Sequence, residues 1–281
     1  MPDWDRIGTI ALGDDVTVRR VGFGGVRLTG PGTFGPPPDL DAARRTVRRA
    51  REAGVQLFDT ADCYGPEISE RLIAEALYPY DDDVVIATKG GRIALGDEHW
   101  RETGRPEQLR EACEGSLQRL RLDTIGLYQL NAIDPDVPVE ESLGALVDLR
   151  EEGKIRSIGV CNVDVAELGR SRAVTAIASV QDHYDLLTRA NEPVLEACGD
   201  DGIAFFAWFF PDPGEAAPSG SAVERVAAAR GATKRQVMLA WLIAHAPAIV
   251  PLPGAPDLET YEEYLEAFAI DLTADERALL G

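Results

Sequence analysis

The sequence predicts a single α/β domain with the (β/α)8 TIM barrel fold. The chain has 281 residues, of which 45% are hydrophobic, so it can bury one large core. Short apolar runs alternate with longer amphipathic segments along its whole length, and no linker or change of composition divides it. Because strand-helix units in this order are typical of a closed parallel barrel, we expect one domain over residues 1–281.

Eight short apolar runs are the expected barrel strands. They cover residues 20–26, 57–61, 84–89, 125–131, 155–161, 179–184, 203–209 and 249–253. Between them, Asp41–Gly54, Pro106–Leu122 and Pro138–Lys154 repeat apolar residues at helical intervals, and glycines close several of these segments. Ahead of them, residues 7–22 alternate in polarity about a turn at residues 13–15, which predicts a β-hairpin plugging the amino-terminal mouth of the barrel.

Composition excludes several classes of partner. The net charge of −20 argues against nucleic acid and anionic membranes, which bind clustered Lys and Arg. Cys63, Cys113, Cys161 and Cys198 lack metal-ligand spacing, so we expect reduced thiols and no metal site. The chain has neither a signal-peptide pattern at its start nor an apolar run of ~18 residues, so we expect a cytoplasmic protein.

Ionisable residues stand at the ends of two neighbouring strands. The segment FDTADCYG carries Asp59 and Tyr64, and VVIATKG places Lys89 at the end of the next strand. A phenol with an ordinary pKa near ~10 is a weak acid, a nearby ammonium lowers that pKa, and a carboxylate holds the ammonium in place. We expect Tyr64 to donate a proton, Lys89 to lower the pKa of Tyr64, and Asp59 to hold Lys89 in place. Taken singly, Asp59 also fits a helix cap, Tyr64 a half-buried core aromatic and Lys89 a solvated cation.

The later strands favour the catalytic interpretation. Polar or aromatic residues also fall at their carboxyl ends, where a parallel barrel places its reactive groups: Asn131, Asn162, Gln181 and Trp208.

The order of these segments resembles the aldo-keto reductase family, in which Asp, Tyr and Lys at this spacing are catalytic. Further similar segments are GKIRSIGVCN, SVQDHYD, RQVMLAWLIAHAP and IVPLPG, so the resemblance covers nearly the whole chain. The opening RVGFGGVRLTGPGTFGPP and the segment ALYPYDDDVVIATK look most similar to the bacterial pyridoxal reductase branch. The resemblance implies NAD(P)H-dependent reduction of a small carbonyl or imine, best guessed as a pyridoxal-like aldehyde, by a monomer or weak homo-oligomer.

One position departs from the family's catalytic pattern. The family has a His at the end of the fourth strand, where this chain has Asn131. An amide donates a hydrogen bond but relays no proton near pH ~7, so a substrate with its own acid, such as a pyridoxal phenol or a protonated imine, would suit the site. The replacement leaves three other interpretations open: a non-redox dehydratase or isomerase, a non-catalytic nucleotide-binding barrel, and a channel-subunit-like accessory protein.

The resemblance also assigns cofactor contacts. Around the nicotinamide carboxamide it places Cys161, Asn162 and Gln181. Trp208 is expected to stack on the ring, with Phe206 and Phe209 as alternatives. The pyrophosphate would lie over the loop after the seventh strand, where Asp212 and Pro213 depart from the family pattern.

The loop after the eighth strand decides the expected nucleotide. Its predicted contacts are Gly254, Asp257 and Thr260. Asp257 at a helix start is a good cap, but its carboxylate repels a 2′-phosphate and can accept from a 2′-hydroxyl. The resemblance to the family implies NADPH, whereas this loop favours NADH or weak binding of either nucleotide.

Four residues near the expected rim are candidates for substrate contact, with ordinary packing as the alternative for each. They are Arg27, Phe34, Trp100 and Tyr128.

Overall fold

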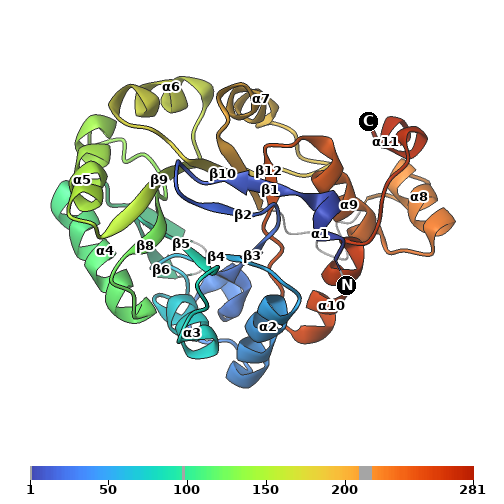
Figure 1. Ribbon diagram of the computed structural model, residues 1–281, viewed down its shortest axis with the longest axis horizontal. Coiled ribbons are helices and arrows are strands. Elements are labelled where there is room, and N and C mark those ends of the chain that lie inside the picture. The colour runs from blue at the N-terminus through green and yellow to red at the C-terminus, as the bar shows by residue number, and fades with distance from the viewer. Residues whose placement is uncertain (1, 97–98, 209–216) are drawn as a thin grey trace.

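The computed structural model describes residues 2–96, 99–208 and 217–281, and it has the predicted TIM barrel fold (Figure 1). Eight parallel strands follow the order β12-β11-β10-β9-β8-β5-β4-β3. The strands are β3 (Gly22–Gly24), β4 (Leu57–Asp59), β5 (Val85–Gly90), β8 (Ile125–Leu130), β9 (Ile155–Cys161), β10 (Ser179–His183), β11 (Ala204–Trp208) and β12 (Ile249–Pro251). The Gly24 N–H donates to the Pro253 carbonyl at 3.1 Å, which links the two outer strands and closes the barrel.

A ring of helices surrounds the strands (Figure 1). Its members are α2 (Leu40–Glu52), α3 (Ile68–Leu77), α4 (Pro106–Leu120), α5 (Val139–Glu151), α6 (Val165–Val174), α7 (Glu192–Asp201), α9 (Lys234–His245) and α10 (Leu258–Ala267). Two further helices lie outside the ring (Figure 1): α8 (Ala222–Arg230), which packs on α9, and α11 (Ala274–Leu280), which packs on α8. Local sequence sets several starts: Asp39 caps α2 by accepting from the Ala42 N–H, and Asp164 with Glu167 forms a capping box on α6. A short helix, α1 (Trp4–Ile7), and two 3-10 turns, η1 (Gly25–Leu28) and η2 (Pro31–Thr33), complete the amino-terminal part.

The predicted hairpin consists of β1 (Thr9–Ala11) and β2 (Thr17–Arg19), which cross one mouth of the barrel (Figure 1). Leu12, Val16 and Val18 pack against strand residues that face the barrel interior. The Ser157 hydroxyl donates to the Leu12 carbonyl at 2.8 Å and fastens the turn to β9. The hairpin therefore plugs the mouth opposite the carboxyl ends of the strands, as the sequence predicted.

A second hairpin was not predicted. It consists of β6 (Arg92–Gly96) and β7 (His99–Glu102), which lie between β5 and α4 and pair Arg92 with Glu102 and Ala94 with Trp100. This hairpin rises from the carboxyl end of the strand that carries Lys89. It therefore brings side chains from beyond the barrel strands to the rim.

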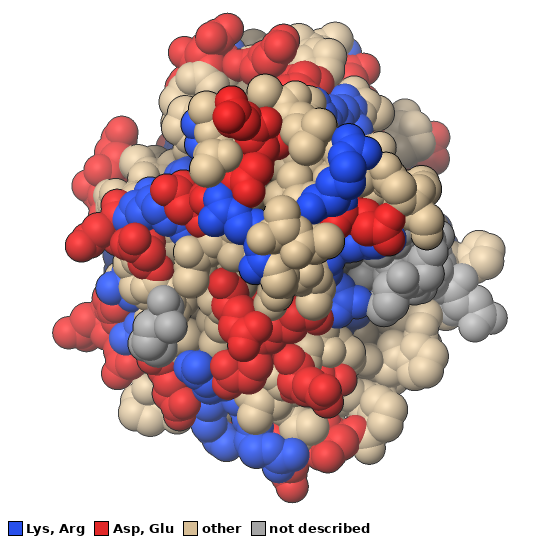
Figure 2. Space-filling view, turned by 90° about the vertical axis from the view of Figure 1, so that its right-hand side faces the viewer, with Lys and Arg blue, Asp and Glu red and all other residues tan. Residues whose placement is uncertain are grey.

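Charged side chains of both signs are interspersed on the side of the molecule where α8 and α11 lie (Figure 2). Some are paired between helices: Arg230 with Glu276 at 2.5 Å, and Arg235 with Glu263 at 2.8 Å. None of the helices in the described ranges is long and apolar enough to cross a membrane.

Candidate active site

The carboxyl ends of the strands surround a cavity of about 430 Å³. Most residues predicted for catalysis and nicotinamide binding line it, together with one of the predicted substrate residues: Asp59, Tyr64, Lys89, Trp100, Asn131, Cys161, Asn162, Gln181 and Trp208. Its other lining residues were not predicted as site residues: Gly24, Val26, Thr33, Cys63, Arg92 and Leu252. The topology thus brings the strand-end residues together, as expected for a parallel barrel.

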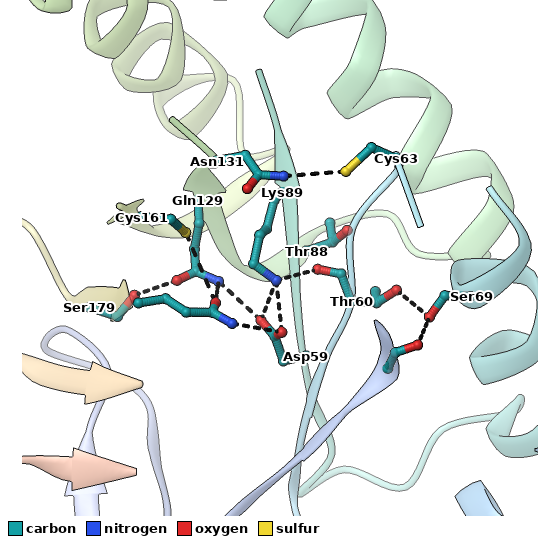
Figure 3. A network of polar contacts seen from close by, with 12 residues as sticks. Asp59, Thr60, Cys63, Ser69, Thr88, Lys89, Gln129, Asn131, Cys161 and Ser179 are labelled. Atoms are coloured by element: carbon teal, nitrogen blue, oxygen red, sulfur yellow. Dashed lines mark hydrogen bonds and ion pairs between the residues drawn. The ribbon is translucent and has the colours of Figure 1, made fainter. Parts of the chain in front are cut away.

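Lys89 and Asp59 form a buried ion pair at this cavity (Figure 3). The Lys89 Nζ lies 2.8 and 2.7 Å from the two Asp59 carboxylate oxygens and donates a third bond to the Thr60 carbonyl at 2.7 Å. Each residue of the pair is 2% exposed. Every N–H of the ammonium therefore has a protein acceptor.

The charge of Lys89 is stabilised by its surroundings. Burial by itself lowers the pKa of Lys89, but the negative charge of Asp59 and its hydrogen bonds to the ammonium outweigh burial, so the pKa lies above its ordinary value. Burial raises the pKa of Asp59 above its ordinary value, and the charge of Lys89 and the hydrogen bonds from Lys89 and two side-chain amides act against that rise. The site therefore holds a permanent ammonium.

Gln129 is a member of this network that sequence reasoning missed. Its Nε2 donates to Asp59 at 3.1 Å and to the Gln181 Oε1 at 2.9 Å, and its Oε1 accepts from Ser179 at 3.2 Å (Figure 3). Gln129 is 0% exposed on a barrel strand, and a buried amide needs partners of this kind. A polar residue on the interior face of a predicted buried strand was the available signal.

Gln181 takes part in the same network. Its Nε2 donates to the second Asp59 oxygen at 3.1 Å. The structure thus shows Gln181 holding Asp59, while its predicted contact with the nicotinamide carboxamide stays a prediction.

The Tyr64 side chain lies at the cavity beside Lys89. The Nζ is 5.1 Å from the centroid of the tyrosine ring, and within the described part of the chain no residue is hydrogen-bonded to the hydroxyl. Burial raises the pKa of Tyr64, and the opposing effect of Lys89 is smaller. The expected net lowering of this pKa is therefore wrong, because losing water penalises the phenolate more than the ammonium stabilises it.

Asn131 occupies the fourth-strand position of the site. Its side chain is 6% exposed, and the Nδ2 donates to the Cys63 sulfur at 3.4 Å (Figure 3). Burial raises the pKa of the Cys63 thiol well above its ordinary value, so this acceptor is a neutral sulfur and a weak one. The amide thus retains donor capacity toward the cavity.

Asn162 is placed at the cavity edge by an unusual backbone. It has a φ of 55°, in the left-handed region that asparagine tolerates better than most residues. Its N–H donates to the Gln181 carbonyl at 3.0 Å, and its Nδ2 donates to the Asn131 carbonyl at 2.8 Å. These bonds connect β8, β9 and β10 where their side chains meet the cavity.

Trp208 borders the cavity with His183 stacked against its indole. The ring centroids are 4.3 Å apart and the planes differ by 11°. Phe206, one of the alternatives, is 0% exposed and packs in the interior core against the hairpin side of the barrel, so it is not at the cavity. Three residues named for this region lie outside the described part of the chain: Phe209, Asp212 and Pro213.

Tyr128 requires a correction. It is 0% exposed and belongs to the core between the strands and the helices, and it does not line the cavity. The strand alternates its side chains, so Gln129 faces the interior and Tyr128 faces the helix layer. The expected substrate contact is therefore wrong.

Arg27 and Phe34 are also absent from the cavity lining. Arg27, on η1, lies beside Gly254. Phe34 is 45% exposed and bridges to Gly65 in the loop that carries Tyr64. Their roles in substrate contact stay predictions.

The loop after β12 has a clear structural arrangement. Asp257 is exposed and caps α10, accepting from the Thr260 N–H at 2.8 Å. A Cβ on Gly254 would lie 2.5 Å from the Gly24 carbonyl oxygen, so a larger residue would not fit there. The helix cap accounts for Asp257 and Thr260, and the close approach to Gly24 accounts for Gly254. The nucleotide contacts of these residues stay predictions.

The fold and site define an oxidoreductase-type barrel that presents a phenol beside a fixed ammonium. In the described ranges no cluster of three or more His, Cys, Asp or Glu side chains could hold a metal ion. Residues 20–210 match the model of the Aldo/keto reductase family, and the chain belongs to that family.

Three relatives place the chain within the family. It is 37% identical over 273 residues to an uncharacterized oxidoreductase of Schizosaccharomyces pombe, covering 97% of this chain and 89% of the relative. It is 35% identical over 273 residues to pyridoxine 4-dehydrogenase of Escherichia coli, covering 95% of each. The crystal structure of an aldo/keto reductase from Klebsiella pneumoniae in complex with NADP and acetate is similar with a TM-score of 0.79 and 27% identity, covering 97% and 93%. The protein is therefore an oxidoreductase of the aldo-keto reductase type.

Proposed function

We propose that this protein reduces a pyridoxal-like aldehyde or a related imine, with Tyr64 as the general acid. The observation that carries the proposal is the Tyr64 side chain, which lines the cavity beside the Lys89–Asp59 pair and whose hydroxyl has no hydrogen bond with any described residue. No described residue therefore competes with a substrate oxygen for the proton of this hydroxyl.

The chemistry requires a donor where negative charge develops. Bound NAD(P)H would supply the hydride, and the substrate heteroatom would then carry negative charge. Tyr64 gives its proton to that atom, and the neighbouring ammonium of Lys89 stabilises the phenolate that remains. Because the pKa of Tyr64 is raised, the phenol stays protonated between reactions.

The residues fit a nicotinamide on one side of the cavity. Cys161 and Asn162 come from the end of β9, and Trp208 comes from the end of β11, with β10 between them. Together they offer amide, thiol and aromatic groups at the cavity. A planar ring against Trp208 and a carboxamide against Asn162 would hold the cofactor near Tyr64.

Asn131 supports a substrate that brings its own acid. The buried amide donates to Cys63 and has no titratable proton near neutral pH. The phenol of a pyridoxal ring or the proton of an imine supplies what the amide lacks. The similarity to pyridoxine 4-dehydrogenase of Escherichia coli supports the same substrate class.

We propose that NADH binds at least as well as NADPH. The exposed carboxylate of Asp257 stands at the start of α10, where it would repel a 2′-phosphate. The NADP found in the Klebsiella pneumoniae enzyme argues for the opposite preference. Direct comparison of the two nucleotides decides between them.

Two measurements on the purified protein test the proposal. Titration with NADH and NADPH should quench tryptophan fluorescence, with NADH binding at least as tightly. When pyridoxal is then added to the enzyme loaded with reduced nicotinamide, the absorbance of the reduced nicotinamide should fall as pyridoxine forms. Nucleotide binding without reduction of pyridoxal would contradict the substrate, and the lack of reduction of any aldehyde or imine would contradict the proposed function.

A further inference from the structure

The cavity holds a second cation that the proposed chemistry does not use. Arg92 begins β6, three residues after Lys89, and lines the same cavity. Its Nε is buried and has no hydrogen-bond partner in the part of the chain that the structure describes. A buried N–H without a partner is unfavourable, and on a charged group it is more so. An anionic ligand in the cavity would satisfy it.

The hairpin fixes where Arg92 points. Arg92 pairs with Glu102 and Ala94 pairs with Trp100, so the side chains of Arg92, Trp100 and Glu102 share one face of the hairpin. Arg92 and Trp100 both line the cavity. This face of the hairpin is therefore a wall of the site, with a cation next to an aromatic ring.

Glu102 holds the guanidinium without using all of its donors. One terminal nitrogen of Arg92 lies 3.3 Å from the Glu102 carboxylate. An arginine has five N–H donors in a planar fork that matches two acceptor oxygens at once. Glu102 thus positions the fork, and the unpaired Nε remains available to a second anion.

Lys89 cannot serve the same purpose. Its three N–H donors are already taken by Asp59 and Thr60. Among the described lining residues, Arg92 is the cation that keeps unpaired donors. An anionic group of a ligand would therefore lie on the Arg92 side of the cavity.

We infer that Arg92 determines substrate specificity by binding an anionic oxygen substituent of the substrate, and that the preferred substrates are aromatic or heteroaromatic aldehydes bearing a carboxylate or phenolate. This inference rests on the proposed reduction at Tyr64. Trp100 covers the ring, Arg92 binds the anion, and the aldehyde reaches Tyr64.

Matched substrates and variants test the role of Arg92. The ortho, meta and para carboxybenzaldehydes are compared with their uncharged methyl esters by kcat/KM, measured at one fixed concentration of the reduced nicotinamide. The variants are Arg92→Gln, Arg92→Lys and the control Arg101→Gln, whose residue pairs with Ile93 and projects from the opposite face of the same hairpin.

The wild type should prefer at least one acid over its ester. Arg92→Gln should lower kcat/KM for that acid by ~10- to 100-fold, mainly through KM, because a charge-assisted hydrogen-bond pair is lost. The esters should change less than about twofold in the same variant, Arg92→Lys should keep part of the preference, and Arg101→Gln should keep all of it.

Two results would overturn the inference: a wild type that prefers none of the acids, or an Arg92→Gln enzyme that slows acids and esters equally. If the wild type reduces no aldehyde, the proposed function fails, and the role of Arg92 in binding an anion is then tested by ligand binding without turnover. Carboxybenzyl alcohol should then quench tryptophan fluorescence in the wild type more strongly than benzyl alcohol does. Equal binding of the acid by Arg92→Gln and wild type would also overturn the inference.

Discussion

Replacing Asp59 with asparagine tests the buried ion pair that supports the site. The Asp59 carboxylate accepts from Lys89, Gln129 and Gln181. An asparagine keeps one acceptor oxygen and turns an NH2 toward these donors, which leaves the 2% exposed Lys89 without a counter-charge. Removing one partner of a buried pair costs about 3–5 kcal/mol, which corresponds to roughly a thousandfold change in the ratio of folded to unfolded protein.

The pH dependence gives this loss a specific signature. In the wild type the pKa of Lys89 is raised, so the stabilisation is complete below the unfolded pKa of ~10.4 and is lost only as pH rises through the folded value. In Asp59→Asn, burial acts with less opposition and lowers the pKa of Lys89. The folded variant then binds fewer protons than the unfolded chain and gains stability as pH rises. The deficit should be largest near neutral pH and shrink toward about pH 10.

Urea denaturation followed by tryptophan fluorescence at several pH values measures this deficit. The control is Glu152→Gln, which removes an exposed partner of Arg110 and Lys154 and should leave the denaturation midpoint nearly unchanged. A variant as stable as the wild type at neutral pH would refute the energetic role of the pair. A deficit that does not change with pH would refute the assignment of a permanent charge to Lys89.

Three further substitutions have defined outcomes. Asn131→His should raise kcat/KM for a nitrobenzaldehyde relative to pyridoxal and add a titration step near pH ~6.5; no gain on any aldehyde would contradict the role of the amide. Asp257→Arg should shift the ratio of NADH to NADPH dissociation constants toward NADPH by ~10-fold, whereas an unchanged ratio would show that this residue does not face the nucleotide. Burial and the charge of Glu70 raise the pKa of Asp62 to about 8. Above pH ~4 the folded state therefore retains a proton that the unfolded chain loses, so the stability of the wild type should fall as pH rises toward about 8. Asp62→Asn should flatten that fall in urea denaturation, and an unchanged slope would contradict it.

The barrel was predictable because its strands are buried on both faces. In the sequence such strands are short apolar runs, and the polar residues at their ends are easily recognised, as Asp59 and Lys89 are. The strand lengths were less predictable: β3 ends at Gly24 because a 3-10 turn begins at Gly25. The candidate catalytic residues come from strand ends, so their convergence followed from the topology.

What the sequence did not show depends on orientation and on distant contacts. Tyr128 and Gln129 are adjacent, and only the register decides which of them faces the interior. Arg92 reaches the cavity through a hairpin whose pairing was not visible as a pattern. The sign of the shift in the pKa of Tyr64 depends on how fully the ring is buried, which residue spacing does not reveal.

The rate of hydride transfer in Tyr64→Phe tests whether Tyr64 is the proton donor. Enzyme loaded with the reduced nicotinamide is mixed with pyridoxal in a single turnover, and the loss of nicotinamide absorbance is followed. We expect a rate at least ~100-fold below that of the wild type, because the developing oxyanion has lost its acid, and an unchanged dissociation constant for the nucleotide. A wild-type rate in Tyr64→Phe would contradict the assignment of Tyr64 as the proton donor.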